Sequence, residues 1–179
     1  MIYIFYLLLV RIYRNNVTLT KNEKTIVNDI SFYRVELLNE NNELSSVFTP
    51  QETIKIRLFY KINKKLSGLR IVYQLRTLSN EIVFTSTDHS VRKSDDLSPN
   101  YYLTEGAIPK NLLSLKKYKL IIWAGNPGVN KYINEVETIN FSVIGSGNHG
   151  SNYQDYKHWP GIISPKIDWK IEKMEGYNG

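Results

Sequence analysis

The chain has 179 residues, of which 42% are hydrophobic and 22% are charged, the balance of one folded domain with additional segments. It contains no cysteine, which excludes disulfide bonds and thiolate metal sites. The net charge of +6 comes from lysine and arginine residues spread along the chain rather than gathered in one patch, so we expect no nucleic-acid partner.

The N-terminal segment, residues 1–29, is an apolar run followed by a polar stretch. Residues 1–10 are apolar throughout, but a membrane-spanning helix needs roughly 20 such residues, and the run lacks the features of a signal peptide. Three interpretations stay open: a membrane anchor formed by residues 1–14, an element docked on the body, or the end of a longer parent chain. Residues 15–29 are predicted to be a linker. We expect a cytoplasmic protein, in contact with the inner face of the plasma membrane only through residues 1–14 or a partner.

Residues 30–145 are predicted to form an all-β fold, a two-layer antiparallel β-sandwich of immunoglobulin-like or jelly-roll-like type. Apolar and polar residues alternate in short runs that are separated by turn residues, and no helical period of useful length occurs. The predicted strands are Ile30–Leu38, Glu52–Ile62, Leu69–Arg76, Ile82–Thr87, Tyr101–Ala107, Lys117–Ala124 and Glu135–Val143. The inward residues of each strand should fill the space between two sheets.

One predicted strand has an unusual outward side. Between Tyr118 and Trp123, every second residue is expected to face the core, and the remaining positions include Ile121 and Trp123 where a solvated face should be polar. Two interpretations stay open. Either the N-terminal apolar run or a partner subunit covers this side, or the side binds a ligand that stacks on the indole.

An immunoglobulin-like connectivity would place the third, sixth and seventh predicted strands in one sheet. Their outward side chains then form an aromatic surface ringed by polar groups, which suits a sugar, because its C–H faces pack on rings and its hydroxyls pair with planar polar groups. We expect Trp123 to stack on a sugar ring, and polar neighbours to hold hydroxyls or an acidic substituent. The predicted carbohydrate-binding residues are Trp123, Ile121, Val72, Gln74, Arg76, Thr138 and Asn140.

Residues 146–179 are predicted to be a hinge and a C-terminal segment. The glycine-rich run 145–150 matches a dinucleotide-binding pattern, but the prolines that follow prevent the helix that such a site requires. We therefore expect a flexible hinge. After it, Ile163, Ile167 and Trp169 are expected to form an extra C-terminal strand, on this sandwich or on that of a neighbouring subunit.

We find no catalytic constellation in the sequence. It has no phosphate-binding loop, and its three histidines lack metal-ligand spacing. The neighbours Asp88 and His89 are interpreted as a solvated turn rather than a catalytic pair, and Asp95 and Asp96 as another turn rather than a calcium site. We therefore expect a protein that is not an enzyme and that holds no cofactor and no metal.

The order of several segments resembles the C-terminal domain of Wzt-type ATPases, the nucleotide-binding subunits of ABC transporters that export O-antigen and related polysaccharides. These segments are residues 32–43, 52–60, 84–88, 108–113, 118–120 and the closing run 160–169.

The resemblance implies a β-sandwich that recognises the non-reducing end of the finished glycan and so couples chain termination to export. In that family an ATPase domain precedes the sandwich, whereas here only residues 1–29 do, so the partner ATPase or transporter subunit is expected on a separate chain. We also expect a homodimer. The alternative is a structural or interaction domain that mediates dimerisation or docks to a transporter or glycosyltransferase partner.

Overall fold

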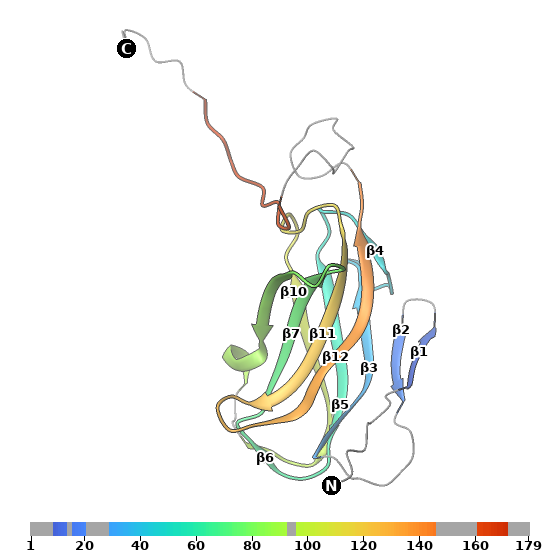
Figure 1. Cartoon of the computed structure of the whole chain (residues 1–179), viewed down its shortest axis with the longest axis vertical. Coiled ribbons are helices and arrows are strands. Elements are labelled where there is room, and N and C mark those ends of the chain that lie inside the picture. The colour runs from blue at the N-terminus through green and yellow to red at the C-terminus, as the bar shows by residue number, and fades with distance from the viewer. Residues whose placement is uncertain (1–8, 14–15, 21–28, 93–95, 146–160, 172–179) are drawn as a thin grey trace, which may run out of the picture.

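The structure is a computed structural model that describes residues 9–13, 16–20, 29–92, 96–145 and 161–171. Two five-stranded sheets pack against each other as a sandwich (Figure 1), which confirms the predicted fold class. Every strand pairing in the two sheets is antiparallel except that between β4 and β12.

The strands fall into two main sheets and one small one. Sheet A has the order β1-β2-β3-β5-β10, with the bounds Leu9–Tyr13, Asn16–Thr20, Ile30–Leu38, Ile54–Ile62 and Asn100–Ile108. Sheet B has the order β4-β12-β11-β7-β8, with the bounds Val47–Phe48, Asn130–Val143, Lys117–Asn126, Arg70–Thr77 and Ile82–Thr87. The small sheet pairs β6 (Leu66–Ser67) with β9 (Asp96–Leu97), and a short 3₁₀ helix, η1, spans Asp88–Val91.

The core lies between sheets A and B and follows from the alternation of the sequence. Strand β5 buries every second residue from Ile54 to Ile62 while the residues between them are half-buried. From the other sheet, Tyr118, Leu120 and Ile122 of β11 are fully buried in the same cluster. Burial of these side chains from both layers is the main stabilising term of such a sandwich.

All seven predicted strands are present, as β3, β5, β7, β8, β10, β11 and β12. The prediction of a linker over residues 15–29 is wrong in one part, because β2 lies inside it and pairs with β1 and β3. Hairpin β1–β2 therefore extends sheet A at the edge of β3, in line with the docked-element interpretation. The rest of the N-terminal apolar run and the predicted hinge lie outside the described residues, and the proposed domain division stays a prediction.

The described part of the tail, residues 161–171, is hydrogen-bonded to the sandwich over residues 162–166. Ile163 forms an isolated bridge with Leu113, and the Ser164 N–H donates to the Leu112 carbonyl at 2.8 Å. Figure 1 shows the rest of this segment, in red, leaving the body of the molecule. The expected extra strand is thus an isolated bridge at Ile163, and beyond it the Lys166 N–H donates to the Asn111 carbonyl at 3.3 Å. Within the described ranges, no helix has the length and apolar character needed to cross a bilayer.

Candidate functional site

The outer face of sheet B brings together most of the predicted site residues. The prediction that the third, sixth and seventh predicted strands share a sheet is confirmed, since β7, β11 and β12 are neighbours. Trp123 of β11 lies opposite Val72 of β7, and Ile121 lies opposite Gln74. Residues directly opposite each other in an antiparallel pair point to the same side of the sheet. These four side chains therefore share one face.

Strand β8 widens this face with two threonines that are not among the predicted site residues. Thr87 lies opposite Val72 and Thr85 opposite Gln74, and both threonines are exposed. The signal that could have found them is the short turn at residues 78–81, because strands joined by a tight turn are usually neighbours in a sheet.

A β-bulge in β12 changes which residues lie at the opposite side of the face. Leu120 pairs with Ile139 but Ile121 pairs with Glu137, so Thr138 is the extra residue between two paired ones. Simple alternation placed Thr138 on the outer face, whereas the register places Glu137 opposite Ile121. The side chains of both residues are outside the described part of the structure.

Beyond the bulge the register agrees with the predicted arrangement. Asn140 of β12 and Arg76 of β7 lie on either side of the same residue, Lys119 of β11. Asn140 is exposed, and Lys119 is half-buried. Lys119 thus adds a basic side chain to the face between two predicted site residues.

Trp123 is half-buried and keeps part of its surface open to solvent. Its neighbour on β7, Val72, is also half-buried, and beyond it the exposed Thr87 supplies a hydroxyl. The indole is therefore not packed away under the described parts of the chain. An aromatic ring with an open surface and nearby hydroxyl groups can pack against the C–H face of a sugar.

Ile121, expected to be part of an exposed surface, is instead only 4% exposed. The reason is a series of polar contacts that crosses from β8 to β12 over the central strand. Gln74 donates from its amide to Thr85 Oγ1 at 2.9 Å and accepts from Arg76 Nε, and Arg76 Nη2 lies 3.0 Å from Glu135 Oε2. We call Thr85, Gln74, Arg76 and Glu135 the polar chain. Ile121 lies on β11, beneath the point where the polar chain crosses from β7 to β12.

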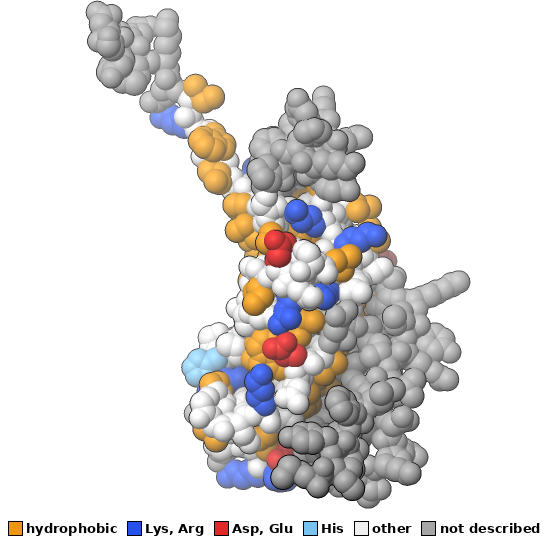
Figure 2. Space-filling view, viewed as in Figure 1, with side chains coloured by type: hydrophobic (Ala, Val, Ile, Leu, Met, Phe, Trp, Pro, Cys, Tyr) orange, Lys and Arg blue, Asp and Glu red, His pale blue; other side chains and the backbone are white. Residues whose placement is uncertain are grey.

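The hydrogen bonds within the polar chain leave some of its side chains accessible to a ligand and others not. Gln74 is 7% exposed and uses both ends of its amide within the protein. The side chains of Arg76 and Glu135 are 21% and 45% exposed, so guanidinium and carboxylate groups remain accessible beside the indole. Figure 2 shows this side of the molecule as a mixture of basic, acidic and hydrophobic side chains. Such a mixture offers donors and acceptors to a polyhydroxylated ligand.

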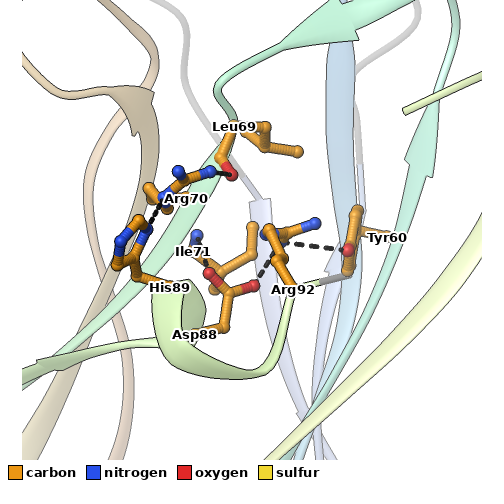
Figure 3. A network of polar contacts seen from close by, with 7 residues as sticks. All are labelled: Tyr60, Leu69, Arg70, Ile71, Asp88, His89 and Arg92. Carbon is orange, nitrogen blue, oxygen red and sulfur yellow. Dashed lines mark hydrogen bonds and ion pairs between the residues drawn. The ribbon is translucent and has the colours of Figure 1, made fainter. Parts of the chain in front are cut away.

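A second polar cluster lies at the edge of the sandwich around η1 (Figure 3). Asp88 accepts from the Ile71 N–H at 3.0 Å and forms an ion pair with Arg92, whose Nη2 also lies 3.5 Å from the Tyr60 hydroxyl. Burial raises the pKa of Tyr60 despite its contact with Arg92. The interpretation of Asp88 as part of a solvated turn is wrong, because its side chain is only 11% exposed.

Asp88 and His89 do not form a catalytic pair in this cluster. His89 accepts from Arg70 Nε at 2.6 Å, whereas Asp88 is engaged with Ile71 and Arg92. The cluster joins η1 to strands of both sheets, which is a structural role. Across the described ranges, no group of three or more His, Cys, Asp or Glu residues could hold a metal ion.

Comparison with known proteins gives a match in structure but none in sequence. No protein-family model matches the chain, and no curated protein matches it. The crystal structure of the C-terminal domain of Wzt is similar, with a TM-score of 0.63 and 12% sequence identity, over 81% of this chain and 85% of that chain. The resemblance expected from the sequence is confirmed at the level of the fold.

Two glycosidase structures match part of the chain with lower similarity. Bacteroides uniformis β-glucuronidase 2, covalently bound to cyclophellitol-6-carboxylate aziridine, has a TM-score of 0.42 and 14% identity over 60% of this chain and 13% of that chain. A Bacteroides uniformis β-glucuronidase has a TM-score of 0.38 and 15% identity over 59% and 12%. We draw no functional argument from these partial similarities.

Proposed function

We propose that this domain is a non-catalytic carbohydrate-binding module that recognises a cell-surface polysaccharide of the O-antigen type, at its terminus, in ABC-transporter-dependent export. The observation that carries the proposal is the partly open indole of Trp123 beside the polar chain on the outer face of sheet B. The shared fold with the C-terminal domain of Wzt supports it, because that family resemblance implies glycan recognition.

In this proposal each group on the face has its own role. A sugar ring packs its C–H face on Trp123, and its hydroxyls pair with the accessible guanidinium of Arg76 and carboxylate of Glu135. Gln74 acts as a positioning residue, since its amide holds Arg76 in place rather than facing the ligand. Asn140 extends the polar edge of the site beyond the bulge in β12.

The proposal has consequences for partners and location. The domain would act together with an ATPase or transporter subunit on another chain, in the cytoplasm at the inner face of the plasma membrane. It would work as a homodimer.

The test is a calorimetric titration with the polysaccharide of the host cell, using two tryptophan variants. Trp123→Ala should weaken binding by about tenfold, because the stacking surface is lost. Trp169→Ala is the matched control, since that indole lies in the tail and is 84% exposed, and it should bind as the unmodified chain does. Unchanged affinity in Trp123→Ala would contradict the assigned face, and failure to bind any glycan would contradict the function.

A second function, as an interaction domain, is favoured by the tail. Its apolar residues Ile163, Ile167 and Trp169 are 49%, 59% and 84% exposed, which is unusual for a segment with no partner. If this segment docks on a second copy, the full chain should sediment as a dimer and a chain truncated after Gly150 as a monomer. A full chain that stays monomeric at high concentration would argue against this role.

A further inference from the structure

The outer face of sheet A carries another aromatic surface, on the opposite side of the sandwich from Trp123. The ring of Tyr33 lies 6.3 Å from that of Phe59 and 6.0 Å from that of Tyr101, measured between centroids. Tyr101 is 63% exposed and Leu103, next to it on the same side of β10, is 53% exposed. Tyr33 and Phe59 are half-buried beside them, and a contiguous group of exposed and half-buried apolar side chains on a sheet face often marks a binding surface.

Two cations lie directly on these rings. Lys61 of β5 pairs with Tyr101 of β10, and its Nζ is 5.1 Å from the centre of the Tyr101 ring. Arg34 of β3 pairs with Phe59, and its Cζ is 3.7 Å from the centre of that ring. Both distances are within the range of cation–π contacts. We call Tyr33, Arg34, Phe59, Lys61, Tyr101 and Leu103 the Tyr101 surface.

The charges on this side of sheet A are only partly compensated. Arg57 lies 2.5 Å from Glu105, and Arg34 lies 3.3 Å from Glu36. Among the described residues, no carboxylate forms an ion pair with Lys61. Within the described part of the chain, the most exposed ring of the surface therefore has beside it an ammonium group that no carboxylate neutralises.

This arrangement differs from the face around Trp123, where the guanidinium of Arg76 already has a carboxylate partner in Glu135. A neutral sugar would leave the ammonium group of Lys61 without a counter-charge. A sugar with a carboxylate can pack its ring on Tyr101 while the carboxylate pairs with Lys61. The excess positive charge thus selects among the ligands that an aromatic surface can take.

We propose that the Tyr101 surface is a second carbohydrate-binding surface, and that its ligand is a glycan unit bearing a carboxylate, such as a uronic acid. The inference rests on the proposed carbohydrate-binding function and adds a site and a substrate class to it. Because the two surfaces are the outer faces of different sheets, a substitution in one should leave the other intact.

The experiment uses the full chain and two probes that differ only in charge. One probe is an oligogalacturonate, and the other is the methyl-esterified oligomer of the same length. The unmodified chain should bind the acidic oligomer several-fold more tightly than the ester, and the difference should shrink as salt is raised because the contact is exposed. Calorimetry or changes in amide NMR shifts would measure both affinities.

Two variants and two controls assign the contacts. Tyr101→Ala should weaken binding of both oligomers by about tenfold, because the stacking ring is lost. Lys61→Gln should weaken binding of the acidic oligomer alone, so that the two oligomers bind equally. Lys55→Gln removes the same charge from the same strand, at a position where Lys55 already contacts Asn42 at 2.7 Å, and should not change binding. In Trp123→Ala, which alters the other sheet, the acidic oligomer should still bind several-fold more tightly than the ester.

Several outcomes would overturn the proposal. Equal affinity of the unmodified chain for the two oligomers, or no binding of oligogalacturonate, contradicts it, while binding of the host polysaccharide in the same assay keeps the proposed function. Weakening by Trp123→Ala instead of Tyr101→Ala places the site on sheet B. If Tyr101→Ala changes only the sedimentation of the chain, or only binding to anionic vesicles or to a DNA oligonucleotide, the occupant is a second copy, a membrane or a nucleic acid.

Discussion

Buried Tyr118 and half-buried Tyr73 differ in what their hydroxyl groups contribute to the fold. The Tyr118 hydroxyl lies 2.8 Å from the Ser114 carbonyl oxygen and 3.0 Å from that of Ile162, so it links the core to the start of the tail. The Tyr73 hydroxyl is shielded from solvent and has no hydrogen-bond partner among the described residues. A buried polar group without a partner costs stability, whereas a paired one contributes to it.

We therefore predict opposite effects for the same substitution at these two positions. Tyr118→Phe should lower the free energy of unfolding by about 1 kcal/mol, because it removes a shielded hydroxyl that donates to a main-chain carbonyl. Tyr73→Phe should leave it unchanged or raise it, because the substitution removes an unpaired hydroxyl. Urea denaturation of both variants measures the difference. A clear loss of stability in Tyr73→Phe would mean that its hydroxyl has a partner in solution.

The same residues determine how stability depends on alkaline pH. Burial raises the pKa of Tyr73, with a smaller contribution from Asp88, and burial also raises the pKa of Tyr118. In the unfolded chain these hydroxyls ionise near pH 10.0, while in the folded chain they stay protonated to higher pH. The unfolded state therefore loses protons first, and the free energy of unfolding should fall as the pH rises above about 10. Tyr73→Phe should make this fall less steep.

At the residue scale, alternation alone could place Trp123 and Ile121 on one outward face. It could not show that Ile121 would be buried, because the cover comes from Arg76 reaching from β7 to Glu135 on β12. That contact depends on side-chain conformations of three strands that are distant in sequence. For the same reason the sequence did not predict the Tyr101 surface, because its rings come from three strands, β3, β5 and β10.

At the scale of elements, strands with regular alternation were predictable and interruptions of it were not. Strands β3 and β8 have the predicted bounds, because turn residues flank both of them. The bulges at Thr138 in β12 and Tyr33 in β3 add one residue to one strand only. Such an insertion is visible only once the partner strand is known, so the sequence pattern alone placed Thr138 opposite Ile121, where the register has Glu137.

Two glycine turns give a prediction at this scale. Gly68, before β7, and Gly128, between β11 and β12, both have positive φ, +67° and +76°, where other residues are strained. A Cβ atom on Gly68 would lie 2.5 Å from Asn126 Nδ2, whereas one on Gly128 would have nothing within 4 Å. Gly128→Ala should cost about 1 kcal/mol from backbone strain, and Gly68→Ala about 2 kcal/mol or more because Asn126 must also move.

Thermal and urea unfolding of the two glycine variants would measure these costs. Asn126 donates to the Ser67 carbonyl at 3.1 Å, so its displacement should also weaken the turn between β6 and β7. Equal destabilisation by the two substitutions would show that the space around Gly68 adapts without cost.

For the whole molecule, the sandwich and the membership of β7, β11 and β12 in one sheet followed from the sequence, because each layer must bury one face of its strands. The contact between the two sheets at the edge near η1 did not follow from the sequence. It depends on the ion pair of Asp88 and Arg92, which are 11% and 10% exposed, and on the contact of Arg92 with Tyr60 in the opposite sheet. Neighbouring charges in the sequence do not reveal that a pair is buried.

This contact between the two sheets leads to a prediction with an internal control. Arg92→Met should lower the free energy of unfolding by about 3 kcal/mol, because it leaves the shielded carboxylate of Asp88 without a cation. Arg57→Met breaks the pair with Glu105, whose side chains are 31% and 41% exposed, and should cost less than about 1 kcal/mol.

A double-mutant cycle separates the ion pair from the other contacts of its members. Asp88→Asn keeps an acceptor for the Ile71 N–H but removes the charge, so the double variant with Arg92→Met should lose less stability than the two single losses added together. Urea unfolding of the four proteins gives the coupling free energy directly. Strict additivity, or equal costs for Arg92→Met and Arg57→Met, would mean that the two sheets are held together at this edge by apolar packing alone.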